Sequence, residues 1–162
     1  PTVTTEEYMT SLKRIYGHVQ SRYPGRAILL SQSTLGSVYG AKELEKMINL
    51  GLTQMSPENL IISINDYGPD HSGEYIGLLN DPLQRYRVWV TETGVNEPNL
   101  AISFVQNNYP QIQNNLRAER MYWYVMWGGD GPPDANFSLI GEPGRFPNYW
   151  KSYLFKLLTG SR

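Results

Sequence analysis

The stretch YRVWVTETG, residues 86–94, decides how the fold of this chain is interpreted. Its first part, Tyr86 to Val90, is a short run of apolar and β-branched residues, which is typical of a buried strand. The segment Thr91-Glu92-Thr93-Gly94 follows at once and introduces a carboxylate beside turn-forming groups. The stretch therefore predicts a strand whose carboxyl end carries a polar, chemically useful side chain.

Three further runs of the same kind lie on either side of this strand. They are Ala27 to Leu30, Leu60 to Ile64 and Met121 to Trp127. The starts of successive runs lie about 26 to 35 residues apart, a spacing that fits a strand, a helix and two loops.

Helical apolar patterns occupy the segments before, between and after these runs. The predicted helices begin near Thr5, span Ala41 to Leu50, follow an N-cap at Asn96, and span Tyr149 to Leu158. Strands that alternate with helices imply right-handed crossovers and a parallel sheet. We therefore expect one α/β domain over residues 1–162.

Composition excludes several classes of function. The 162 residues are 40% hydrophobic and 18% charged, with 14 Lys and Arg against 15 Asp and Glu, so a globular and nearly neutral protein is expected. A nucleic-acid partner is not expected, because binding phosphates needs a basic excess, and no run is long enough to span a membrane. The chain has no Cys, which excludes disulfides and thiolate metal sites, and its 2 His lie far apart in the sequence, so no metal site is predicted. Nothing in the sequence fixes where the protein is located.

Polar side chains follow each predicted strand, at the edge where parallel sheets place their sites. Gln32 follows the first strand, Asn65 and Tyr67 follow the second, Glu92 ends the third, and Trp127 ends the fourth. A carboxylate, a phenol that can bond to it and an indole platform are the groups that a retaining glycosidase needs around one sugar.

Several of these segments resemble the clan A glycoside hydrolases, which are retaining enzymes built on (β/α)8 barrels. Val88-Trp89-Val90-Thr91-Glu92-Thr93-Gly94 resembles their seventh, nucleophile-bearing strand. Ile62 to Tyr67 is similar to the sixth strand, although Asn65 stands where the family usually has His. Tyr122 to Trp127 is similar to the eighth strand, and Glu6 to Leu30 is similar to the fourth helix and fifth strand.

The resemblance covers nearly the whole chain but only half of a barrel, the part from strand five to strand eight. It implies that Glu92 is the nucleophile, that Tyr67 orients Glu92, and that Trp127 stacks on the sugar. Asn65 and Gln32 would bind sugar hydroxyls. No cofactor is implied.

The acid/base residue of the family follows its fourth strand, so we expect that residue from a missing or partner half. Asn96-Glu97-Pro98 spells the family's acid/base motif, but Glu97 lies only five residues after Glu92. We interpret this segment as a helix start. The expected partners are therefore a carbohydrate and either a second copy of the chain or a complementary half-barrel, and the chain alone should be inactive or weak on natural glycosides.

Other interpretations remain open for the chain and its residues. The half-barrel could be a non-catalytic carbohydrate-binding or assembly protein, or the chain could be an independent four-stranded α/β domain. Glu92 could be a surface carboxylate, and Tyr67 could pack at the rim. Asp66 is interpreted as the cap of the turn after the second strand. The sugar and the linkage cannot be predicted.

Overall fold

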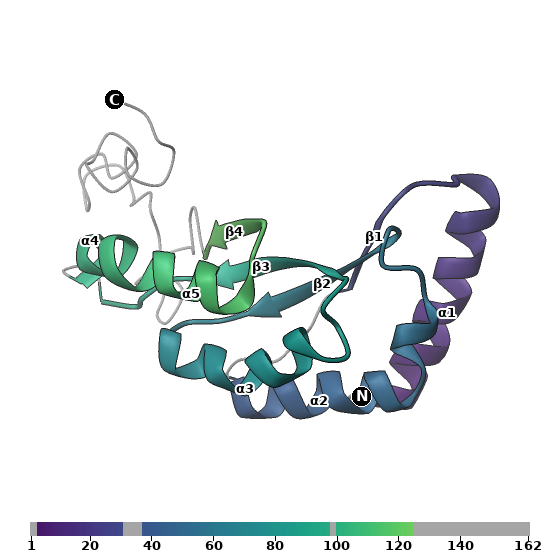
Figure 1. Ribbon diagram of the computed structural model, residues 1–162, viewed down its shortest axis with the longest axis horizontal. Helices are drawn as coiled ribbons and strands as arrows, with labels where there is room; N and C mark the ends of the chain where they lie inside the picture. Colours follow the sequence, from purple (N-terminus) through teal and green to yellow (C-terminus); the bar gives the residue numbers. More distant parts are fainter. Residues whose placement is uncertain (1–2, 31–36, 98–99, 125–162) are drawn as a thin grey trace.

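The computed structural model describes residues 3–30, 37–97 and 100–124 (Figure 1). Helices and strands alternate along most of this part of the chain. In order, the elements are α1 (Thr5–Arg22), β1 (Ile28–Leu30), α2 (Ser37–Asn49), η1 (Leu52–Gln54), β2 (Leu60–Asn65), α3 (Pro69–Asn80), β3 (Arg87–Thr93), α4 (Ala101–Ser103), the π-helix η3 (Phe104–Asn108), α5 (Tyr109–Leu116) and β4 (Arg120–Trp123).

The strands form one parallel sheet in the order β1-β2-β3-β4, which is also their order in the chain. The expectation of a mixed α/β chain with a parallel sheet is therefore confirmed. The finer expectation, that this sheet is half of a (β/α)8 barrel, stays a prediction. The single domain expected over residues 1–162 extends beyond the described residues.

The hydrophobic core lies between one face of this sheet and the helices. Alternate residues of β2 and β3 point into it, among them Leu60, Ile62, Val88 and Val90, and all four are buried. Neighbouring helices contact one another in the sequence α1, α2, α3, α5. Figure 1 shows α2 and α3 running side by side below the strands.

On the opposite face of the sheet, which we call the open face, β3 and β4 carry aromatic and charged side chains, whereas Ile61 and Ser63 of β2 are buried. Trp89 of β3 lies against Tyr122 of β4, with ring centroids 6.1 Å apart. The guanidinium groups of Arg87 and Arg120 lie 5.8 and 5.1 Å from the Trp89 ring. Tyr122 is 42% exposed, so this face keeps a large aromatic group in contact with solvent.

A capping box begins α1. The Thr4 side chain accepts a hydrogen bond from the Glu7 N–H, and the Glu7 carboxylate accepts one from the Thr4 N–H. The N-cap is thus Thr4, and the helix begins at Thr5, where the sequence predicted its start. Met9 and Leu12 are buried on this helix, whereas Ile15, which belongs to the same apolar pattern, is 55% exposed.

The α-helix after β3 is described from Ala101, with Leu100 as its N-cap. The Leu100 N–H bonds to the Glu97 carbonyl, and residues 98–99 lie outside the described part of the chain, so the N-cap expected at Asn96 stays a prediction. The π-helix η3 follows, and the Tyr109 N–H bonds to the Phe104 carbonyl five residues earlier. Pro110 has no N–H, and its ring would clash with the Gln106 carbonyl in a regular α-helix. The wider π turn accommodates this proline.

Some predicted features lie outside the described residues. They are Gln32 and Trp127, residues 125–127 of the predicted fourth strand and the helix predicted over Tyr149 to Leu158. Among the described residues, no helix is long and apolar enough to cross a membrane.

Candidate functional site

Tyr67 and Glu92 meet at the carboxyl ends of two adjacent parallel strands. The Tyr67 hydroxyl donates a hydrogen bond of 2.8 Å to Glu92 Oε2, and both side chains are partly buried. Tyr67 stands two residues beyond the end of β2, and Glu92 is the penultimate residue of β3. The structure therefore joins two of the residues that the sequence singled out, at the edge where it placed them.

A β-bulge turns Glu92 toward the open face. Ile64 pairs with Val90, but the next residue, Asn65, pairs with Glu92, so Thr91 is an extra residue in β3. Regular alternation would place Glu92 on the same side as Val90, among the apolar side chains beneath the helices. The inserted residue reverses this, and Glu92 shares a face with Asn65.

Asn65 is tied to the bulge through its side chain. Its Oδ1 accepts a hydrogen bond of 2.8 Å from the Thr91 hydroxyl. The Asn65 residue is only 7% exposed, although it carries a polar amide. Asn65, Thr91 and Glu92 therefore form one connected group at the end of the sheet.

Hydrogen bonds of Asp66 fix the segment that carries Tyr67 beside Glu92. The Asp66 N–H donates to the Glu92 carbonyl at 2.9 Å. The Asp66 carboxylate accepts hydrogen bonds from the Gly68 N–H at 3.0 Å and from the Ser72 hydroxyl at 2.7 Å. Asp66 is 1% exposed, and the prediction that it caps this turn is confirmed. Its bonds hold the short segment from which Tyr67 reaches Glu92.

Tyr124 is a member of this site that the sequence analysis missed. Its ring meets the Tyr67 ring edge-on, with centroids 6.5 Å apart and planes at 84°. Its N–H donates to the Thr93 carbonyl at 2.7 Å, so the residue directly follows the paired part of β4. Its position at the end of a strand could have identified it. The apolar run Met121 to Trp127, however, predicts a strand that continues past Tyr124, whereas β4 ends at Trp123.

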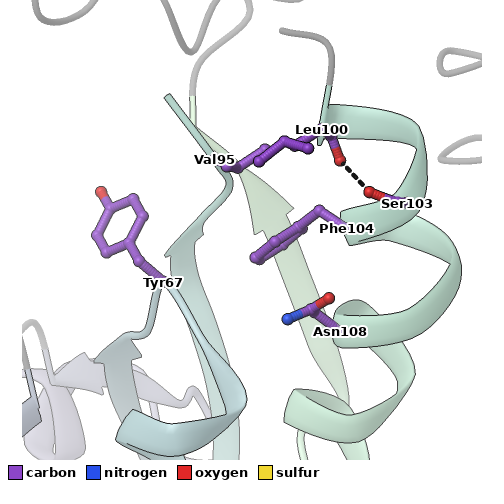
Figure 2. Close-up of a pocket in the computed structure, with 6 residues that line it drawn as sticks. All are labelled: Tyr67, Val95, Leu100, Ser103, Phe104 and Asn108. Atoms are coloured by element: carbon purple, nitrogen blue, oxygen red, sulfur yellow. Dashed lines mark hydrogen bonds between the residues drawn. The ribbon is translucent and has the colours of Figure 1, made fainter. Parts of the chain in front are cut away.

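A pocket of about 270 Å³ lies between the Tyr67 ring and the start of the helix after β3 (Figure 2). Its lining is uncharged and consists of Tyr67, Val95, Leu100, Ser103, Phe104 and Asn108. Figure 2 shows the Tyr67 hydroxyl pointing away from the other five residues. The Ser103 hydroxyl donates to the Leu100 carbonyl at 2.9 Å. One side of Tyr67 thus borders a small uncharged hollow while its hydroxyl bonds to Glu92.

The remaining candidates are placed as follows. Asn96 and Glu97 are exposed, and the Glu97 carbonyl accepts a hydrogen bond from the Leu100 N–H. Within the described part of the chain, no three His, Cys, Asp or Glu residues are grouped so that they could hold a metal ion. Gln32 and Trp127 cannot be placed relative to Glu92, because both lie outside that part.

Comparisons of this chain with protein-family models, curated proteins and solved structures gave no significant match.

Proposed function

We propose that this chain is the nucleophile-bearing half of a retaining glycoside hydrolase, with the fold of half a (β/α)8 barrel. The observation that carries the proposal is the hydrogen bond of 2.8 Å between the Tyr67 hydroxyl and Glu92 Oε2. The parallel sheet in chain order, with the helices packed on one face, also supports it. In such a barrel the carboxyl ends of the strands surround the site.

The chemistry assigned to this pair is a double displacement at the anomeric carbon of a glycoside. Glu92 Oε1 attacks that carbon, the bond to the leaving oxygen breaks, and a glycosyl ester of Glu92 forms. Water then attacks the same carbon and releases the sugar and the free carboxylate. The Tyr67 hydroxyl, by bonding to Oε2, keeps the carboxylate in one orientation and leaves Oε1 free to react.

The acid/base of this proposal comes from the other half of the barrel. Retention needs two carboxyl groups about 5 to 5.5 Å apart on opposite sides of the scissile bond. Glu97 lies only five residues after Glu92, in the segment that follows β3, and is exposed, so it does not suit that role. The partners are then a carbohydrate and either a second copy of the chain or a complementary half-barrel. Asn65, Gln32 and Trp127 are proposed to contact the sugar.

A mechanism-based label tests the nucleophile without an acid. In 2,4-dinitrophenyl 2-deoxy-2-fluoroglycosides the leaving group departs as an anion, so the first step needs no proton donor. We expect one member of a gluco, galacto, manno and xylo panel to release one equivalent of dinitrophenolate and to add one fluorosugar to the chain. Peptide mapping should place the sugar on Glu92.

Two variants make this experiment decisive. Glu92→Gln should abolish the label, while Glu97→Gln, which removes the neighbouring exposed carboxylate, should leave it unchanged. A label on Glu97, or no label from any of the four sugars, would contradict the proposal. Sugar binding without labelling, measured by titration calorimetry, would favour the non-catalytic carbohydrate-binding protein instead.

A further inference from the structure

We propose that Thr91 is a positioning residue that aims both Glu92 and the Asn65 amide at a bound sugar. This inference rests on the proposed function and extends it to a residue with no role in the chemistry itself. Thr91 is the extra residue of the β3 bulge, and its hydroxyl donates to Asn65 Oδ1 at 2.8 Å. It therefore links the residue before the nucleophile to the neighbouring strand.

The first consequence concerns the direction of Glu92. A bulge is an inserted residue whose pairing is disrupted, so something must favour it over regular alternation. The Thr91 side chain supplies a hydrogen bond across the strands at this point. Without that bond, the alternative register would bring Glu92 to the face that Val88 and Val90 share with the helices.

The second consequence concerns the Asn65 amide. Its Oδ1 accepts the hydrogen bond from Thr91, while its Nδ2 has no hydrogen-bond partner in the described part of the chain. An amide nitrogen can only donate. Thr91 thus fixes Asn65 as a donor beside Glu92, in a residue that is only 7% exposed. The ligand atom that this donor fits is a hydroxyl or ring oxygen of an uncharged sugar.

Thr93 provides a matched control on the other side of Glu92. Its hydroxyl is buried and has no hydrogen-bond partner among the described residues. Thr91 and Thr93 are the same residue type, each next to Glu92, but only Thr91 has a bonded hydroxyl. Replacing each by isosteric valine therefore separates the effect of this bond from that of a general change in β3.

The test measures the maximal rate constant with which Glu92 is labelled by the reactive fluoroglycoside. Thr91→Val should lower this rate constant about tenfold, because one oriented hydrogen bond is lost. The number of fluorosugars bound per chain should stay the same. Thr91→Ser, which retains the hydroxyl, should restore most of the rate. Thr93→Val should label as fast as the wild type. Equal rates for the wild type and Thr91→Val, or equal losses in both valine variants, would overturn the inference.

The Asn65 amide gives a second readout that does not depend on labelling. In ¹⁵N-edited NMR spectra, the two Nδ2 protons, assigned by their loss in Asn65→Asp, should shift in Thr91→Val and not in Thr93→Val. If the wild-type chain is not labelled by any probe, the proposed function is wrong. The spectra would still decide whether Thr91 orients the Asn65 amide. Unshifted Nδ2 protons in Thr91→Val would contradict the inference in either case.

Discussion

Two buried tyrosines show how much one hydrogen bond matters at the scale of a residue. The Tyr86 hydroxyl donates to the Met55 carbonyl at 2.6 Å. The Tyr75 hydroxyl is buried as well but has no hydrogen-bond partner among the described residues. Burial raises the pKa of Tyr75, and the nearby negative charge of Asp66 adds to the effect. No hydrogen bond among the described residues therefore offsets the free-energy cost of burying the Tyr75 hydroxyl.

Removing the two hydroxyls should have opposite effects on the free energy of unfolding. Tyr75→Phe should leave it unchanged or raise it by up to about 1 kcal/mol, because an uncompensated group leaves the core. Tyr86→Phe should lower it by about 1 kcal/mol, because the Met55 carbonyl loses its partner. Urea unfolding of both variants measures this directly. Equal destabilisation by both would show that the Tyr75 hydroxyl has a partner in solution.

At the scale of elements, Tyr109 connects α5 to β4. Its hydroxyl donates to the Met121 carbonyl at 2.9 Å, and burial raises the pKa of Tyr109 to about 12. In the unfolded chain a tyrosine titrates near pH 10. The folded state holds the proton more tightly, so this stabilisation is fully present below about pH 10 and is lost as the pH rises through about 12.

The free energy of unfolding should therefore fall between about pH 10 and about pH 12. Tyr109→Phe should be less stable at neutral pH, because it lacks the bond to Met121, but should lose less stability over this alkaline range. Denaturant midpoints at a series of pH values measure both effects. Tyr75 and Tyr86 also have raised pKa values, so part of the fall should persist in the variant. An unchanged slope in Tyr109→Phe would contradict the assignment.

The elements that the sequence predicted best are those set by local patterns. Buried parallel strands are continuous apolar runs, so β2 was placed to within one residue, and its meeting with β3 followed from the rule for parallel strand ends. The bulge was not predictable, because alternation from Val88 and Val90 places Glu92 in the core. The π-helix η3 was not predictable either, because helical apolar spacing does not distinguish a π turn from an α turn.

On the scale of the whole molecule, the part of the sheet that the structure describes ends in two edges. Within the described residues, β1 pairs only with β2 and β4 only with β3. Unpaired parallel edges and an exposed aromatic side chain such as Tyr122, which is 42% exposed, favour association with another chain. The Trp89 and Tyr122 rings, which lie together on the open face, are the best candidates to contact a partner there.

We therefore expect the chain to associate with itself or with a complementary half-barrel. Light scattering over a dilution series should give a molar mass that rises with concentration, and Tyr122→Glu should weaken this rise by placing a charge on the open face. A variant of an exposed residue on the helical side, Lys13→Glu, serves as the control. A constant monomer mass over the whole series, also after addition of a complementary half, would contradict the expectation.

The agreement between strand order and chain order has a consequence for how this protein acquires its structure. Each strand finds its partner about one helix later in the chain, so no pairing in the described sheet has to wait for a distant segment. Pairing with the next strand in the chain closes a shorter loop than pairing with a distant strand, and therefore has a lower entropic cost. The β2-α3-β3 unit can act as a nucleus to which the flanking units are added. On the ribosome, the amino-terminal units can then pack while the later ones are still being synthesised.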